Sequence, residues 1–475
     1  MKFKTKIITL ATATCMVLTD SVWAQKTNEI QHIKFDDEGW EQMAPKLQRK
    51  YVYGEKGMLA LFKMDKGAKV PLHHHPNEQT SYITKGSVKV TMQGKEYMVK
   101  AGEILIIPAN IPHEFECLED GTLDFDFFAP PRTDWINGTA NYFGNTTATQ
   151  PQLETVATMD IRPGDVAVSA SGRVFATIHP LGSQKMQLVE IVNGRAVAYP
   201  NESFQKNYQP ATNTNFDAML GLIFDKKGRL WVIDMGLELG TTRLWSFDIN
   251  TNKVIEKIEL PRAIAPKGSF LQDVVIDEKN NWAYLADIAN PGIIAIDLKT
   301  KNARRFSGHN SLLAEDKDMI IDSKVINFGG KPARVAIDPI TLSANRETLF
   351  FGAMNGTTWY KVPAKLFREN KDDKTIGEAI TVAGKKPFSD GATTDAAGNH
   401  YFTNLQEHSI TKLSTNGNLT DVLKCNSLLL WPDNVYLGSD NWMYISTNQL
   451  NTTPAFTGGR DEGKPPYYIY RFKLK

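Results

Sequence analysis

Two stretches decide the fold of the first part of the chain: GAKVPLHHHPNEQTSYITKG at residues 67–86 and GEILIIPANIPH at residues 102–113. His73 and His75 are two residues apart, so on a strand they face one side while His74 faces the other. Three neutral imidazoles and an amide oxygen suit a divalent transition metal such as iron, manganese, nickel, copper or zinc. We therefore predict a metal site formed by four side chains: His73, His75, Gln79 and His113.

Two alternatives stay open for these residues. Glu78 lies one residue short of the ligand position, and strand alternation puts it on the face opposite His75 unless a bulge intervenes. Gln79 is therefore the preferred ligand, and Glu78 is the second choice. The other alternative is a solvated histidine-rich turn, which would leave the glycine spacings, Pro108 and His113 as coincidence. A neutral ligand set leaves the charge of the ion uncompensated, so the site would favour an anionic ligand.

Short β-rich runs separated by turns fill residues 51–128, which predicts a closed antiparallel barrel or jelly roll. This segment resembles the cupin superfamily, whose motifs are G-x5-H-x-H-x3or4-E-x6-G and G-x5-P-x-G-x2-H-x3-N. The chain departs from these motifs at three positions, where Gln79 replaces Glu, Asn110 replaces Gly and Cys117 replaces Asn. The resemblance implies a small barrel that holds its metal on the motif residues.

A turn followed by an aromatic strand recurs six times after residue 158. The copies begin at residues 169, 225, 277, 338, 395 and 438, as SASGRVFATI, DKKGRLWVID, DEKNNWAYLAD, DPITLSANRETLFFG, DAAGNHYFTN and GSDNWMYIST. A short apolar strand precedes each copy, which gives the repeated sheet that a β-propeller blade needs. We expect six blades, and we expect the C-terminal strand YYIYRFKLK to join a strand from the preceding linker in the closing blade.

The ordered set RLWVIDMG, PFSDGATTDAAGNHYFTNLQEHSITKL and WPDNVYLGSDNWMYISTNQL resembles the major royal jelly protein and Yellow family. The resemblance covers residues 160–475, roughly two thirds of the chain. It implies a secreted six-bladed propeller but no single chemistry, since members include isomerase-like proteins, amine binders and proteins without known activity. The fold is also similar to that of the gluconolactonase and senescence-marker group, whose metal lies in the central channel.

Aligning the six repeats predicts which side chains meet at the centre of the propeller. The candidates are Asp165, Asp273, Arg334, Asp390, Asp433 and the neighbouring Asn434, while Leu220 occupies the position in the second repeat. Carboxylates that converge in this way repel one another unless a cation such as calcium or a polar ligand joins them. The alternative is structural, because aspartates at such turns also accept hydrogen bonds from backbone N–H groups.

Length and composition indicate two globular domains in a chain of 475 residues with a formal charge of +1. The boundaries we expect are a signal peptide at 1–24, a cupin domain at 25–131, a linker at 132–158 and a propeller at 159–475. Cleavage after Ala24 would give a secreted or periplasmic protein without a stable membrane anchor. The near-neutral charge argues against a nucleic-acid partner.

The leading hypothesis is a metalloprotein that acts on a small molecule, with the cupin metal as a dioxygenase-like or isomerase-like centre and a ligand-binding propeller. Two alternatives stay open. Both domains could bind ligands without catalysis, or the propeller could act as a lactonase-like hydrolase while the cupin stabilises the protein or forms a homodimer. Motifs of serine hydrolases, kinases and zincins are absent from the sequence.

Overall fold

The computed structural model describes residues 32–37, 39–136, 153–182, 185–322, 324–426, 428–439 and 441–474. The chain divides between Thr149 and Gln150 into two compact units, and this division falls within the predicted linker. The predicted signal peptide lies outside the described residues. Of the helices that the structure describes, none has the length and apolar character needed to cross a membrane.

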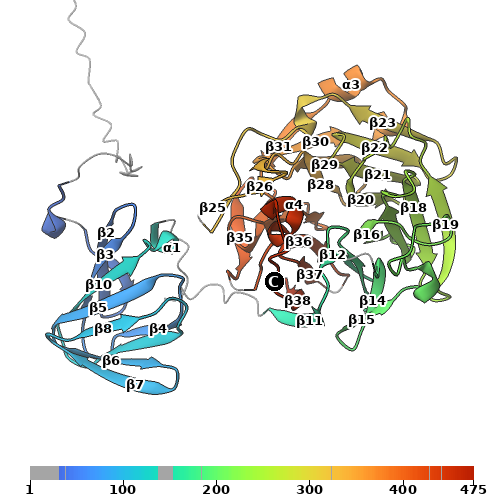
Figure 1. The fold of residues 1–475 in the computed structure, drawn as a ribbon. Coiled ribbons are helices and arrows are strands. Elements are labelled where there is room, and N and C mark those ends of the chain that lie inside the picture. Colours follow the sequence, from blue (N-terminus) through green and yellow to red (C-terminus); the bar gives the residue numbers. More distant parts are fainter. Residues whose placement is uncertain are drawn as a thin grey trace, which may run out of the picture. The chain divides into compact units, whose positions relative to one another are not determined.

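The first unit contains two antiparallel sheets in a cupin-like arrangement (Figure 1). The six-stranded sheet has the order β1-β2-β3-β10-β5-β8 and consists of Glu41–Ala44, Leu47–Tyr53, Met58–Met64, Thr122–Ala129, Glu78–Lys85 and Ile104–Ile107. The four-stranded sheet has the order β4-β9-β6-β7 and consists of Lys69–His73, His113–Cys117, Ser87–Met92 and Lys95–Lys100. A 3-10 helix, η1 (Phe35–Asp37), precedes the strands, and α1 (Thr133–Ile136) follows them.

The core of the first unit lies between its two sheets. Strand β3 reads MLALFKM and buries Met58, Ala60, Phe62 and Met64, because alternate residues of a strand face the same side. Trp135 of α1 packs edge-on against Phe62 at 5.8 Å, so the start of the predicted linker belongs to this core. The register of β4 and β9 then places two of the predicted ligands opposite each other, since His73 pairs with His113.

The second unit is propeller-like, with six four-stranded antiparallel sheets in the described residues. The first two sheets are β12–β15 (Pro163–Val168, Val174–Ile178, Leu188–Val192, Arg195–Ala198) and β16–β19 (Met219–Phe224, Arg229–Asp234, Arg243–Asp248, Lys253–Glu259). The next two are β20–β23 (Leu271–Asp277, Trp282–Asp287, Gly292–Asp297, Ala303–Ser307) and β28–β31 (Ile337–Leu342, Thr348–Ala353, Thr358–Pro363, Thr381–Lys385). In each of these four sheets the strands follow the order of the chain. The fifth is β32–β35 (Ala392–Thr394, His400–Asn404, Ser409–Leu413, Leu419–Lys424), and the sixth is β11-β38-β37-β36 (Glu154–Met159, Tyr467–Lys473, Trp442–Thr447, Pro432–Leu437).

Short elements connect these sheets. Two small hairpins precede β28, namely β24–β25 (Ile320–Ile321, Lys324–Val325) and β26–β27 (Asn327–Phe328, Lys331–Pro332). The helices are η2 (Glu202–Phe204), η3 (Asn310–Leu312), α2 (Lys365–Arg368), α3 (Asp373–Glu378), η4 (Leu450–Thr452) and α4 (Pro454–Thr457). The helices are all short, so the all-β class predicted from the sequence is confirmed.

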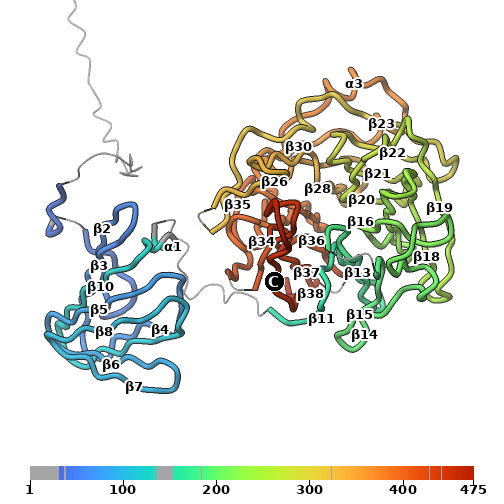
Figure 2. The backbone as a smooth tube through the Cα atoms, viewed as in Figure 1, coloured from blue at the N-terminus to red at the C-terminus, as the bar shows by residue number. Residues whose placement is uncertain are grey.

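The six sheets follow one another around a centre (Figure 2). Each innermost strand contacts the next in the order β12, β16, β20, β28, β32 and β36, and β36 in turn contacts β12. The last sheet is assembled from both ends of the unit, because the C-terminal strand β38 pairs with β11, as the sequence predicts. Arg162 adds to this closure, because its guanidinium forms two 2.6 Å hydrogen bonds with Asp461.

Candidate metal centre and central carboxylates

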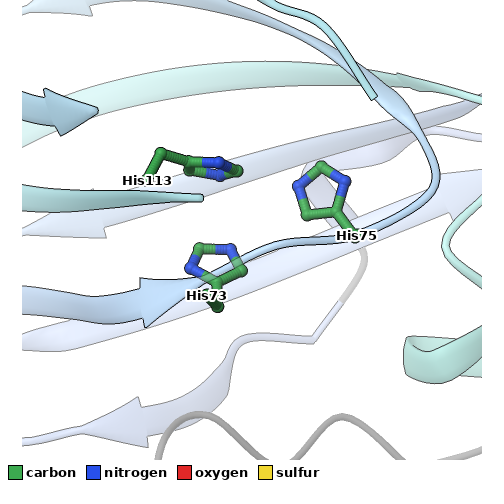
Figure 3. Close-up of side chains that lie close together, drawn as sticks. All are labelled: His73, His75 and His113. Carbon is green, nitrogen blue, oxygen red and sulfur yellow. The ribbon is translucent and has the colours of Figure 1, made fainter. Parts of the chain in front are cut away.

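Three histidines of the first unit turn their rings toward one another (Figure 3). His73 ends β4, His113 begins β9, and His75 lies in the segment that follows β4. The ring centroids of His73 and His113 are 4.4 Å apart, and His75 lies 5.1 Å from His113 and 5.6 Å from His73. One nitrogen from each ring lies within 4.8 Å of the others, which is compatible with a single metal ion.

The hydrogen bonds fix which nitrogen of each ring is available to a metal. Each histidine uses Nδ1 to contact a backbone carbonyl oxygen, at 2.8 Å for His73, 3.0 Å for His75 and 2.7 Å for His113. A carbonyl oxygen only accepts, so each Nδ1 carries the proton and each Nε2 presents a lone pair. The Nε2 atom of His113 is buried and has no hydrogen-bond partner. This arrangement is typical of histidines that ligate a metal through Nε2.

Gln79 supplies the fourth ligand atom of the predicted set. Its Nε2 donates to Asp126 at 2.9 Å and to the Ser81 hydroxyl at 3.0 Å, which fixes the orientation of the amide. The amide oxygen therefore faces Nε2 of His75 at 3.1 Å. Both of these atoms present lone pairs, so their close approach fits a cation held between them. Glu78, the second choice of ligand, is exposed.

The electrostatics of the site keep the imidazoles neutral. Burial, together with the neighbouring His113, lowers the pKa of His73 to about 2. Burial likewise lowers the pKa of His75 to about 3, with a further contribution from Arg132. The pKa of His113 is also lowered, chiefly by burial. At neutral pH the three rings are unprotonated, which is the form that binds a metal.

Two carboxyl groups that sequence reasoning missed lie behind the glutamine. Asp124 and Asp126 face inward from β10, and both are almost fully buried. Asp126 accepts hydrogen bonds from Gln79 and Ser81, while burial raises its pKa to about 6. Burial and the charge of Asp126 raise the pKa of Asp124 well above its usual range. The predicted ligands carry no negative charge, but Asp126, which can carry one, is hydrogen-bonded to the predicted ligand Gln79.

A small pocket adjoins His73, Gln79 and these carboxyl groups. Its lining combines polar and apolar side chains, namely His73, Gln79, Asp124, Asp126 and Arg132 with Phe62, Met64, Val70, Phe115, Phe128 and Trp135. The guanidinium of Arg132 is buried, forms hydrogen bonds with Asp134 at 2.8 and 2.6 Å and lies 4.6 Å from the Trp135 ring. Its positive charge lowers the pKa values of all three histidines, so the pocket is biased toward anions.

Replacing Gln79 with glutamate is expected to lower the melting temperature of the metal-free cupin unit. The second carboxylate oxygen would take the place of the amide nitrogen that donates to Asp126, so two carboxylates would oppose each other in a buried site. Each kcal/mol lost shifts the melting temperature by about 4–8 °C in a domain of this size. Differential scanning fluorimetry in EDTA and in Mn²⁺ measures the loss and its reversal by the cation.

Glu78→Gln is the matched control, because it exchanges the same two groups, a carboxylate and an amide, at an exposed position. We expect this control to melt like the unsubstituted protein. A Gln79→Glu protein whose melting temperature in EDTA is unchanged would contradict the position assigned to the amide nitrogen.

The second unit brings together most of the residues predicted for its centre. The structure buries four predicted carboxyl groups at the starts of innermost strands: Asp165, Asp273, Asp390 and Asp433. Asn434 also lies there, and its side-chain oxygen accepts from the backbone N–H of Val166 at 3.3 Å. That oxygen therefore joins neighbouring strands, which is a structural role.

Arg334 does not lie among these carboxyl groups, and the prediction for it is corrected. Its guanidinium is one-third exposed and forms ion pairs with Asp316 and Asp318, both at 2.9 Å. The innermost strand of that sheet begins at Ile337, so Asp338 takes the central position instead. The strand therefore starts three residues later than the alignment assumes.

The comparisons with known proteins agree with this two-part architecture. A family model described as major royal jelly protein matches residues 219–456, just over half of the chain. The chain belongs to the major royal jelly protein family. A second family model, described as cupin domain, matches residues 60–128 of the first unit. This member of the royal jelly family therefore carries an N-terminal cupin domain.

Curated relatives match each part of this royal jelly family member separately. The pectin degradation protein KdgF of Dickeya dadantii (strain 3937) is 28% identical over 103 residues, which covers 21% of this chain and 94% of the relative. Protein yellow of Drosophila guanche is 24% identical over 193 residues, which covers 38% of this chain. The chain spans only 34% of the length of that Yellow protein.

Two solved structures are among those to which parts of the chain are similar. The structure of KdgF from Halomonas sp. is 28% identical and covers 21% of this chain and 94% of its own, with a TM-score of 0.21. The streptogramin B lyase structure is 12% identical and covers 68% of this chain and 98% of its own, with a TM-score of 0.40.

Proposed function

We propose that the cupin domain is a metal-dependent, isomerase-like centre that acts on a small acidic molecule. The observation that carries this proposal is that Nε2 of His75 and the amide oxygen of Gln79 direct lone pairs at each other. Beside them lies Nε2 of His113, which has no hydrogen-bond partner. A divalent metal bound there would supply a Lewis acid that polarises a carbonyl oxygen of the ligand. His73, His75, Gln79 and His113 would hold it.

The pocket residues favour proton transfer over oxygen activation. Asp126 lines the pocket and is bonded to the proposed ligand Gln79, so its carboxyl group adjoins any molecule bound at the metal. In our proposal the Asp126 carboxylate takes a proton from a carbon beside a carbonyl group, exchanges that proton with water and delivers a proton from the exchanged acid to a neighbouring carbon. Asp124 shares the pocket, and its raised pKa favours the form that donates a hydrogen bond to Asp126.

The chemistry of the pocket suggests a sugar acid as the ligand. Arg132 brings positive charge to the pocket, and one Asp126 carboxylate offsets only part of the charge of a divalent cation held by neutral ligands, so both favour a carboxylate. The relative named as a pectin degradation protein matches the cupin domain over almost its whole length. Pectin is a polymer of acidic sugars, so we propose pectin-derived sugar acids as the first substrates to test.

The test is turnover of such sugar acids by the metal-loaded protein, followed by proton NMR in D₂O with and without dioxygen. We expect deuterium to enter one carbon-bound position of the product under both conditions. Turnover that requires dioxygen would support an oxygenase instead. Tight metal and ligand binding without turnover would favour the non-catalytic alternative.

We also infer that the six sheets of the second unit are the six blades of one propeller. The closed succession of innermost strands, with β36 beside β12, supports this inference. The C-terminal strand β38 would then close the ring by its pairing with β11. A crystal structure of the second unit would test the blade count.

A further inference from the structure

Loops of the first two sheets of the second unit line a pocket of about 270 Å³, which we call the loop pocket. Its walls come from the loop between β13 and β14, the segment that leads into β16, and the loop between β17 and β18. These segments lie at the edge of the sheets where the innermost strands β12 and β16 begin. The lining includes Pro180, Gln187, Lys206, Asp217, Leu237 and Glu238. None of these six residues is among the site residues predicted from the sequence.

A buried lysine forms the polar side of the loop pocket. The Lys206 side chain is 7% exposed, and its Nζ lies 3.3 Å from Asp217 Oδ1 and 2.7 Å from Glu238 Oε2. Burial acts to lower the pKa of Lys206, but the hydrogen bond with Glu238 and the charge of Asp217 raise it overall. The ammonium group therefore stays charged and carries three N–H donors. Two of them face the carboxylates, so one remains for a ligand.

Hydrogen bonds within the protein hold both carboxylates in place. Asp217 Oδ2 accepts from the backbone N–H groups of Glu238 and Leu239 at 2.7 and 2.9 Å. Glu238 Oε1 accepts from the backbone N–H of Ala211 at 3.3 Å. These bonds fix the loop that carries Leu237, so the walls of the loop pocket are formed before a ligand binds.

Gln187 supplies a second donor to the loop pocket. The residue is 1% exposed, and its Oε1 accepts from the backbone N–H of Met219 at 3.3 Å. This bond orients the amide and leaves Nε2 as its free end. Of the described residues, none accepts a hydrogen bond from this Nε2. The amide group therefore offers its N–H donors to a ligand.

The charges of the loop pocket favour a neutral ligand. One ammonium and two carboxylates leave the lining with one net negative charge, which disfavours an anion. A cation gains little, because both carboxylates already contact Lys206. A hydroxyl group both donates and accepts hydrogen bonds. Neighbouring hydroxyls of one molecule can therefore accept from Lys206 and Gln187 and donate to Glu238.

We propose that the loop pocket binds one neutral sugar residue or a similar cyclic polyol. Leu237 is 48% exposed, and together with Pro180 it gives the C–H face of such a ring an apolar contact. The volume lies just below the range of about 300–1,000 Å³ that is usual for ligand pockets, so a single ring fits it. The site lies in the second unit, and the inference does not depend on the function proposed for the cupin domain.

Saturation-transfer difference NMR on the full chain, stripped of metal with EDTA, tests this inference. The probes are glucose, galactose, mannose, xylose, rhamnose and inositol. We expect at least one of them to bind, and Leu237→Ala to lower its affinity by at least about 4-fold, because the ring loses apolar contact. Leu313→Ala is the matched control, because Leu313 is 49% exposed and lies outside the loop pocket. This variant should bind the probe like the unsubstituted protein.

Charged forms of the sugar that binds test the class of ligand, for example glucosamine and glucuronate in place of glucose. We expect the neutral sugar to bind more tightly than either charged form. Tighter binding of the amino sugar or of the sugar acid would overturn the assignment to a neutral ligand. Binding of no probe, or binding that Leu237→Ala leaves unchanged, would overturn the site itself.

Discussion

Replacing His113 with alanine is expected to weaken metal binding at the cupin domain by at least about 100-fold, since losing an outer partner of a ligand alone costs 10–100-fold. His113 lies opposite His73 on the paired strands β4 and β9, and its Nε2 is buried without a partner. The substitution removes one of three imidazoles and leaves the other ligands in place. Competition with a metallochromic chelator measures the change in affinity.

His74→Ala is the control for this experiment. His74 lies between two proposed ligands in sequence but is exposed, because alternation turns it away from them. We expect the affinity of this variant to match that of the unsubstituted protein. Equal losses in the two variants would indicate a histidine-rich surface turn in place of a built site.

Replacing Asp126 with asparagine is expected to lower turnover of the sugar acid by about 10²–10⁴-fold, the usual contribution of a positioned acid or base. The asparagine oxygen still accepts from Gln79, so the proposed ligand keeps its orientation and the metal stays bound. Steady-state kinetics and metal analysis of the same preparation separate the two effects.

Glu78→Gln serves as the control, since it neutralises an exposed carboxyl group on β5, the strand that pairs with β10. We expect full activity from this variant. An Asp126→Asn protein that keeps its activity would assign proton transfer to another group, and one that loses its metal would assign Asp126 to metal binding alone.

The sequence predicts which side chains of the cupin domain come together, because strand alternation and register act over short distances. His73 and His75 lie on one side, and Gln79 rather than Glu78 turns inward, as alternation indicates. The same alternation could have located the acid pair. Phe128 belongs to the core, so Asp126 and Asp124 of the run LDFDFFA share its inward face. Their polarity concealed this, because acidic residues are rarely buried.

The centre of the propeller is harder to predict because its residues come from repeats of unequal length. The fourth repeat carries two extra hairpins, β24–β25 and β26–β27, ahead of its innermost strand. The alignment takes RVAID at residues 334–338 as the innermost strand and so selects Arg334, whereas the strand starts at Ile337 and presents Asp338. Asp165, Asp273, Asp338 and Asp433 lie at register shifts of the innermost strands, and such shifts are tertiary features that alternation alone does not predict.

The most direct test of the central claim is anomalous diffraction from crystals of the full chain grown with Mn²⁺ or Zn²⁺. The account predicts an anomalous peak about 2.0–2.2 Å from Nε2 of His73, His75 and His113, the usual distance of such metals from histidine nitrogen. The amide oxygen of Gln79 should complete the set. Fully metal-loaded crystals without a peak at these three nitrogens, or with Nδ1 as the ligand atom, would contradict the account.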